Sequence, residues 1–175
     1  MRGPSYPLAI AGALLALSPA ARAQVCVAQE LTASDASPGA QFGAGLAVSG
    51  DTLLAGATDA FYVFTRSGST WSEEAKVTAP VPGVSFGVIL AIDGDTAVAG
   101  VLENSNAGAA YVFVRSGTTW TQEARLVPAV PVFGGAFGFR VAVSGDVALV
   151  GHPFDDSAGP SFAGSLSGFT RSGTT

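Results

Sequence analysis

Side chains that could carry chemistry are few in this sequence. Its 175 residues include one histidine, His152, and one cysteine, Cys26, so the chain cannot build a metal site from several imidazoles or thiolates. Residues 83–87 (GVSFG) match the G-x-S-x-G pattern that presents a nucleophilic serine in hydrolases. That pattern needs a helix directly after the serine, whereas the residues that follow Ser85 have the pattern of a strand. We therefore expect no catalytic residue and no enzyme activity.

The same residues belong to an internal repeat. Three segments align without gaps, and each begins with Phe-Gly: 42–56 (FGAGLAVSGDTLLAG), 86–100 (FGVILAIDGDTAVAG) and 137–151 (FGFRVAVSGDVALVG). Gln41 and Ala136 hold the position of Ser85 in the other two copies, so the serine occupies a variable position. Self-similarity at such intervals is typical of solenoids, propellers and other repeat architectures.

Two further blocks recur after the Phe-Gly segments. The first is YVFTRSG at 62–68 and YVFVRSG at 111–117, with a weaker copy, GFTRSG, at 168–173; the second is WSEEAKV at 71–77 and WTQEARL at 120–126. Apolar residues alternate with a period of two, and Ser-Gly-Asp or Asp-Gly-Asp supplies a tight turn between strands. The sequence therefore predicts an all-β fold, a β-propeller-like array of about three four-stranded antiparallel blades.

These blocks resemble FG-GAP repeats, which form the blades of integrin α-chain propellers and occur in many secreted bacterial proteins. The resemblance rests on the Phe-Gly opening, the later Gly56-Ala57 or Gly151-His152-Pro153, and the Arg-Ser-Gly block followed by Trp. It implies a β-propeller that serves as a platform for protein interaction, and it does not imply an enzyme. Some members bind calcium in the first hairpin through D-x-D-x-D-G. Here that hairpin is shortened to Ser-Gly-Asp, so calcium would have to bind without its usual motif, and we expect no cofactor and no metal site.

Domain boundaries follow from the blocks. We expect a signal peptide at 1–23, an N-terminal strand at 24–35, and blades at 42–79, 86–128 and 137–175, the last of them incomplete. Residues 25–33 align with the fourth-strand block, so this strand could complete the third blade, whose own sequence stops before the expected Trp. A closed propeller usually has about four to eight blades. Three outcomes are therefore open: an open arc, two chains that form six blades, and a piece of a longer propeller.

The first residues have the three parts of a secretory signal peptide. Arg2 supplies the positive charge, residues 8–17 (LAIAGALLAL) the apolar run, and Ala21-Arg22-Ala23 the cleavage site. A buried N-terminal helix is the alternative. We expect cleavage after Ala23 and a secreted product, extracellular or periplasmic, without a membrane span. The chain has 8 basic and 13 acidic residues, which leaves no basic face for nucleic acid.

Candidate binding residues lie in the connections between the second and third strands. These connections lengthen from repeat to repeat while the strand spacing stays fixed, which is how repeat proteins usually build a binding face, although neutral drift of surface loops is the alternative. The candidates are Asp59, Glu103, Asn104, His152, Phe154, Asp155 and Asp156. We expect His152 at the edge of a loop, and we expect the hairpin aspartates Asp51, Asp95 and Asp146 to bond the backbone of their own turns.

The functional expectation is a secreted, non-catalytic binding or structural module. Its partner would be a protein or a cell surface, and exposed blade edges could also permit self-association. The alternative is a piece of a larger propeller enzyme, a hydrolase or lyase, whose catalytic residues lie outside this chain.

Overall fold

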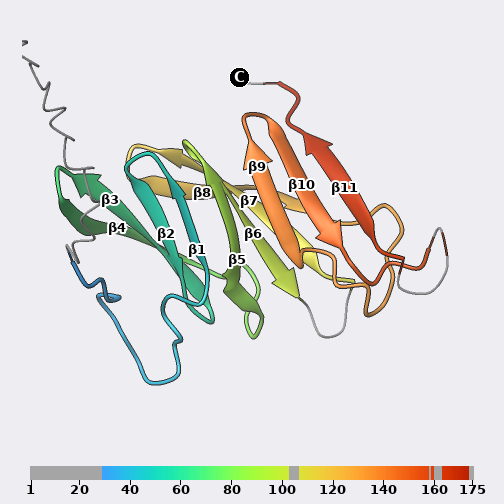
Figure 1. Ribbon diagram of the computed structural model, residues 1–175, viewed down its shortest axis with the longest axis horizontal. Coiled ribbons are helices and arrows are strands. Elements are labelled where there is room, and N and C mark those ends of the chain that lie inside the picture. Colours follow the sequence, from blue (N-terminus) through green and yellow to red (C-terminus); the bar gives the residue numbers. More distant parts are fainter. Residues whose placement is uncertain (1–28, 103–106, 158, 160–162, 174–175) are drawn as a thin grey trace, which may run out of the picture.

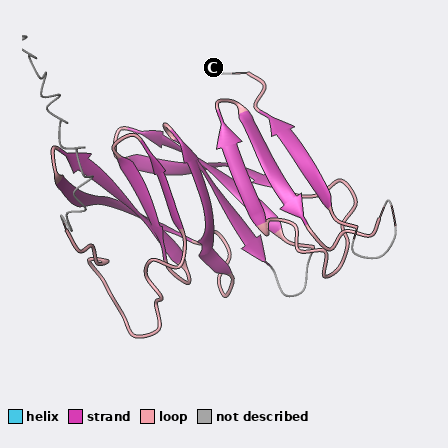
Figure 2. Cartoon of the chain, in the orientation of Figure 1, coloured by secondary structure: helices cyan, strands magenta, loops and turns pink. Residues whose placement is uncertain are grey.

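The structure is a computed structural model that describes residues 29–102, 107–157, 159 and 163–173. Within these residues it contains strands and loops and no helix (Figure 2). The strands are β1 (Leu46–Ser49), β2 (Thr52–Gly56), β3 (Ala60–Ser67), β4 (Thr70–Thr78), β5 (Ser85–Asp93), β6 (Thr96–Leu102), β7 (Ala109–Ser116), β8 (Thr119–Leu126), β9 (Arg140–Ser144), β10 (Val147–His152) and β11 (Ser165–Thr170).

The strands form three antiparallel sheets, which follow one another in sequence order (Figure 1). Blade 1 is β1-β2-β3-β4, blade 2 is β5-β6-β7-β8, and blade 3 is β9-β10-β11. The three sheets stand side by side and do not close into a ring (Figure 1). This confirms the predicted all-β fold and its partial-propeller form, with the third blade lacking a fourth strand among the described residues.

The blades stack through their faces. We call the side of a blade that faces the preceding blade N-facing, and the opposite side C-facing. The first strands lie beside one another, β1 next to β5 and β5 next to β9. One core joins the C-facing side of blade 1, including Leu54, to the N-facing side of blade 2, including Phe113. A second core joins Val98 of blade 2 to Val150 of blade 3.

The second and third Phe-Gly pairs, at 86–87 and 137–138, lie where the backbones of two blades meet. Phe86 is fully buried, and its N–H donates to Thr58 O at 3.0 Å. The next residue, Gly87, donates its N–H to Ala57 O at 3.1 Å, and a Cβ on Gly87 would overlap the carbonyl oxygens of Ala57 and Ala60. The aromatic ring thus fills the core of the junction, and the glycine permits the backbone to approach that core closely.

The junction between blades 2 and 3 repeats this arrangement. Phe137 is fully buried, and its N–H donates to Ala107 O at 2.9 Å. A Cβ on Gly138 would overlap Ala109 O, and a Cβ on Gly100 would overlap Gly138 O. The Phe-Gly pair that begins one aligned segment therefore contacts the glycine that ends the preceding aligned segment.

At the edge of the sheets opposite the Phe-Gly contacts, residues in the hairpins between first and second strands link neighbouring blades. The hydroxyl of Ser49 accepts a hydrogen bond from Gly94 N of blade 2 at 3.0 Å. One repeat later, Asp93 Oδ2 accepts from Gly145 N of blade 3 at 2.7 Å. The residue before the turn glycine thus binds the turn of the following blade.

We expected the hairpin aspartates to bond the backbone of their own turns, but their side chains bind arginines at the ends of the third strands. Arg115 Nε donates to Asp95 Oδ1 at 2.7 Å, and Arg115 Nη1 lies 3.6 Å from Glu74 Oε1 of blade 1. The corresponding ion pairs are Arg66–Asp51 in blade 1, Arg171–Asp146 in blade 3, and Arg171–Glu123 between blades 3 and 2. The register of the second and third strands explains these pairs. Arg115 N donates to Asp95 O at 2.8 Å, and this backbone hydrogen bond brings the two side chains together.

The N-terminal segment also differs from the expected strand at 24–35. Residues 24–28 lie outside the described part, and residues 29–35 form no strand. They cover the N-facing side of blade 1, where Ala33 is buried among aromatic and small residues, instead of completing blade 3. Side-chain contacts attach the segment: Gln29 bonds both backbone groups of Trp71 at 2.8 Å, and Asp35 accepts from Tyr62 Oη at 2.6 Å.

Replacing Gly100 with Ala should lower the free energy of unfolding by about 1–3 kcal/mol, because the added Cβ would overlap Gly138 O. Gly151 is the equivalent residue of blade 3, and a Cβ there would lie 3.5 Å from its nearest neighbour, Arg140 O. G151A should therefore change stability by no more than about 0.5 kcal/mol. Urea unfolding of both variants measures the difference, and equal losses would contradict this account of the junction.

Candidate functional site

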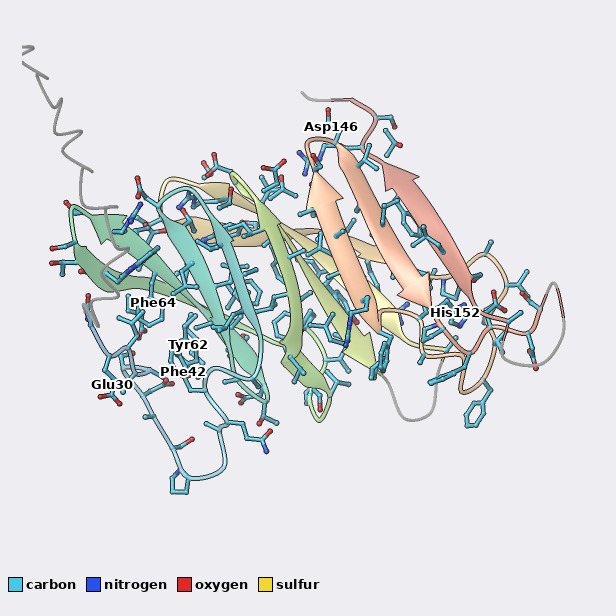
Figure 3. All side chains as sticks on the ribbon, in the orientation of Figure 1. Glu30, Phe42, Tyr62, Phe64, Asp146 and His152 are labelled. Carbon is cyan, nitrogen blue, oxygen red and sulfur yellow. The ribbon has the colours of Figure 1, made fainter. Side chains whose placement is uncertain are left out.

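The connections of the blades emerge at two opposite edges of the array. The hairpins between first and second strands lie at one edge, and the connections between second and third strands lie at the other, which we call the loop face (Figure 1). Figure 3 shows Asp146 at the hairpin edge and His152 at the loop face. The described residues of the second-to-third-strand connections at this face are 57–59, 107–108, 153–157, 159 and 163–164.

The structure brings only some of the candidate residues together. His152, Phe154, Asp155 and Asp156 follow one another at the start of the longest connection, in blade 3. Asp59 is exposed but belongs to blade 1, where its carbonyl oxygen accepts from Ala79 N at 2.8 Å. Glu103 and Asn104 lie outside the described residues.

His152 is buried, contrary to its expected position at a loop edge. Its exposed fraction is 1%, and its ring packs edge-on against Phe137 with a centroid distance of 5.7 Å. The other ring edge lies against Gly135, where a Cβ would overlap Nε2. The cause is the strand period, because Ala148, Val150 and His152 alternate along β10 and share its N-facing side.

Asp155 is a loop-organising residue rather than a solvated acid. Its Oδ1 accepts from Ser157 N at 2.9 Å, its carbonyl oxygen accepts from Gly164 N at 2.9 Å, and its Oδ2 lies 3.6 Å from His152 Nδ1. Hydrogen bonds from the side chains of Ser157 and Ser165, aided by Ser157 N–H, lower the pKa of Asp155 to about 2. The carboxylate thus joins both ends of the connection at 153–164.

Exposed aromatic and aliphatic side chains accompany this connection, and the candidate list omitted most of them. Phe154 is 45% exposed, and Phe133, in the connection between blades 2 and 3, is 79% exposed. The two connections are joined, because Phe154 N donates to Gly135 O at 3.1 Å. Val130 adds a further exposed side chain. We call residues 127–139, 153–157 and 163–164 the blade-3 loop surface; its apolar inter-blade sequence was the signal that could have identified Phe133.

A groove borders this surface and carries a positive charge. Its lining includes Phe139, Arg140, His152 and Leu166. Arg140 is exposed, its Nη1 donates to Phe139 O at 2.8 Å, and its guanidinium stacks on the Phe139 ring at 4.7 Å. Apolar area beside a cation suits a partner with apolar and acidic side chains.

No catalytic constellation is present among the described residues. Ser85 starts strand β5 of blade 2, whereas His152 is buried in blade 3. The described residues hold no group of three or more His, Cys, Asp or Glu side chains that could bind a metal ion. They also include no helix long and apolar enough to cross a membrane. Trp71 and Trp120 pack against the cores of the blades.

Replacing Asp155 with Asn should lower the melting temperature at pH 7, because the loop loses its anionic acceptor. The lowered pKa means that this stabilisation is complete above the ordinary value of 3.8 and is lost as pH falls towards 2. The difference between wild type and D155N should therefore shrink between about pH 4 and pH 2. Thermal unfolding at several pH values measures it, with D156N as the exposed control. A D155N effect that does not change with pH would contradict the assignment.

A comparison with protein-family models identifies the repeats. The model described as FG-GAP repeat matches residues 27–69, 71–113 and 120–168, whereas no curated protein matches the sequence. The second match begins in β4 of blade 1 and ends in β7 of blade 2, so the sequence repeat starts one strand before the structural blade. In the first match, the N-terminal segment takes the place of that preceding strand, which agrees with its position against blade 1. Repeats of this kind build β-propeller-type interaction modules. The chain belongs to the FG-GAP repeat family.

Proposed function

We propose that the chain is a secreted, non-catalytic module that binds a protein or cell-surface partner through the blade-3 loop surface. The observation that carries the proposal is the exposure of Phe133 and Phe154 on two connections that a hydrogen bond joins. Large exposed aromatic side chains are costly in water, and they are enriched where proteins bind one another. The longest connection of the array forms part of this surface.

The loop face also has the mechanical properties that a binding surface needs. Hydrogen bonds join the blades at both edges, through Ser49 and Gly94 at the hairpin edge and through Thr58 and Phe86 at the loop face, but the connections at the loop face differ in length from blade to blade. Asp155 and the buried His152 hold the base of the longest connection. A partner would therefore meet apolar side chains on a supported loop, with less ordering cost on binding. Self-association through blade edges stays a prediction.

Replacing both Phe133 and Phe154 with Ser should weaken binding at least about tenfold, or about 1.4 kcal/mol. The assay titrates fluorescently labelled protein onto intact cells of the producing organism and onto its extracellular material. L46S is the matched control, because Leu46 is also exposed but lies on strand β1 at the N-facing side of blade 1. Thermal unfolding of all three proteins verifies that they fold. Unchanged binding of F133S/F154S, or an equal loss in L46S, would exclude this surface as the binding site.

The secreted location has its own test. The protein recovered from outside the cytoplasm should begin at Gln24, because Ala21-Arg22-Ala23 has the small residues that signal peptidase requires. Intact mass spectrometry of that fraction measures the N-terminus. A23R should leave the leader attached and retain the protein with the cell. Recovery of the chain in the cytoplasm with Met1 or Arg2 at its N-terminus would contradict secretion.

A further inference from the structure

A groove lies between the fourth strands of blades 1 and 2, apart from the blade-3 loop surface. It has a volume of about 460 Å³ and lies between the end of β4 and the start of β8. Ala75 and Pro80 contribute to its blade-1 wall, and Trp120 with Gln122 contributes to its blade-2 wall. Both walls come from neighbouring blades of the array, so the groove is a feature of the junction itself.

The internal repeat shows which group occupies the corresponding place at blade 1. There Gln29 Nε2 donates to Trp71 O at 2.8 Å, and Trp71 N donates to Gln29 Oε1 at 2.8 Å. Trp71 lies opposite Arg66, next to the pair of residues that closes the hairpin between β3 and β4. Pairs in an antiparallel ladder are alternately hydrogen-bonded, so Trp71 turns its N–H and C=O away from β3. One carboxamide thus bonds both of these backbone groups.

Trp120 presents the same two backbone groups in blade 2. It lies opposite Arg115 in the equivalent register, and the N–H of Arg115 points away from it, to Asp95 O at 2.8 Å. The alignment of residues 25–33 with the fourth-strand block places Ala75 where Gln29 stands. The methyl group of Ala75 cannot bond Trp120, and no other side chain in the described part of the chain does so. The groove is therefore the counterpart of a site that a carboxamide fills in blade 1.

Further polar groups of this groove are available to a ligand. Gln122 is the counterpart of Glu73, whose carboxylate accepts from Ser34 N at 2.9 Å. Ser34 corresponds to Pro80, which has neither an N–H nor a hydroxyl, and the amide of Gln122 has no hydrogen bond to the described residues. Trp120 Nε1 is buried and has no acceptor among those residues. A buried donor without a partner costs free energy, so a polar ligand would gain bonds here without breaking any.

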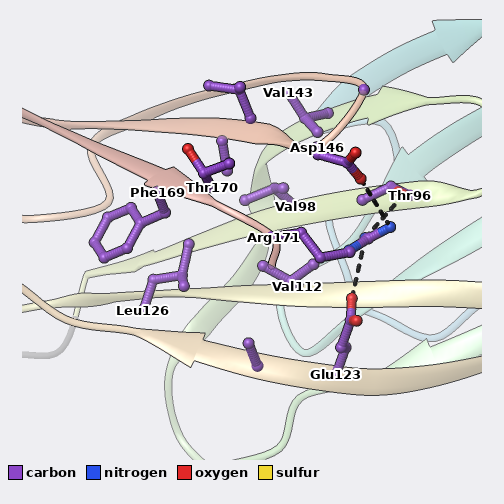
Figure 4. A pocket seen from close by; sticks show the side chains of 14 residues that line it. Thr96, Val98, Val112, Glu123, Leu126, Val143, Asp146, Phe169, Thr170 and Arg171 are labelled. Atoms are coloured by element: carbon purple, nitrogen blue, oxygen red, sulfur yellow. Dashed lines mark hydrogen bonds and ion pairs between the residues drawn. The ribbon is translucent and has the colours of Figure 1, made fainter. Parts of the chain in front are cut away.

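The charges around the groove favour an uncharged ligand. Lys76 is the charged residue of its lining, and Lys76 Nζ already pairs with Asp35 at 2.7 Å. Charged side chains along the two junctions are likewise paired with one another: Arg115 with Glu74, and Arg171 with Glu123 (Figure 4). An ionic ligand would therefore lose hydration without gaining a free counter-ion.

A primary carboxamide is the group that can repeat the bonds of Gln29. Its C=O and one N–H point to the same side, so it can accept from Trp120 N and donate to Trp120 O together. A carboxylate can only accept, and it would face the C=O of Trp120 without a proton. A trans peptide group points its N–H and C=O in opposite directions, so it cannot bond both atoms of one residue.

We propose that this groove binds a glutamine side chain of an extended peptide segment in a protein partner, through two hydrogen bonds between its carboxamide and the backbone of Trp120. Ala75 and Val77 line the groove, so the methylene groups of the glutamine pack on apolar side chains while the carboxamide reaches the strand edge. The groove is separate from the blade-3 loop surface, and the inference does not depend on the function proposed above.

Titration of isotope-labelled protein with two capped tripeptides tests the carboxamide. Acetyl-Ala-Gln-Ala-N-methylamide should shift the backbone N–H resonance of Trp120 saturably in the millimolar range, because that N–H gains an acceptor. The same peptide with Glu in place of Gln should bind at least about tenfold more weakly. The N-methyl cap ensures that the side chain supplies the one primary amide. The N–H of Trp71, which Gln29 already bonds, is the internal control and should not shift.

Two variants exchange the state of the two blades. A75Q supplies a carboxamide from β4 itself, so it should weaken binding of the Gln peptide at Trp120 at least about tenfold. Q29A removes the carboxamide from blade 1, so the N–H of Trp71 should then respond to the Gln peptide. Thermal unfolding checks that both variants fold.

Four results would overturn the proposal. The first is no shift of Trp120 at the highest peptide concentration, and the second is equal binding of the Gln and Glu peptides. The third is a folded A75Q protein that binds the Gln peptide as wild type does. The fourth is equal affinity for propionamide, which would assign the groove to a free amide and not to a peptide. The peptide comparison uses wild-type protein and stays decisive even if A75Q fails to fold.

Discussion

Close contact between two glycine backbones is the constraint on which this structure depends. A blade can stack on its neighbour only where Gly87 or Gly138 meets the end of the preceding second strand, at Gly56 or Gly100. Phe86 and Phe137, which precede Gly87 and Gly138, are buried in the core that this contact closes. Any side chain at these glycines would hold the sheets apart and expose the apolar faces that pay for ordering the strands. The Phe-Gly spacing is therefore a packing requirement, and its repetition says nothing about catalysis.

Polar contacts complete each junction at its other edge and make the two edges of the array unequal. A hairpin hydroxyl or carboxylate binds the next turn, and an arginine joins the aspartate of its own blade to a glutamate of the preceding one. Partly exposed ion pairs contribute little free energy individually, and here they follow from the strand register and connect neighbouring blades. At the loop face, the junctions restrain residues near the strand ends, such as Thr58 and Ala107, and the rest of each connection can vary without loss of stacking.

The strands, their order and the three-stranded third sheet of the described residues could be predicted from the sequence, because the alternation and the turn residues recur at fixed spacing. The burial of His152 could also have been predicted, since it continues the alternation of Ala148 and Val150. The arginine partners of the aspartates were harder to predict, because that contact depends on register across two strands. The position of residues 29–35 could not be predicted, because it depends on which side of blade 1 is left uncovered by the other blades. No local sequence pattern shows this.

The linear order of the blades has a consequence for cooperativity. Blade 2 is packed on both sides, whereas blade 3 has one packed side and leaves Val147 and Leu149 on its C-facing side exposed to solvent. In such a chain each unit is stabilised by its nearest neighbours, as in a one-dimensional Ising system. Of the three described blades, blade 2 therefore has the most stabilising neighbours and should be the last to lose its structure. Blade 3, which carries the connection at 153–164, should open at a lower free-energy cost than blade 2.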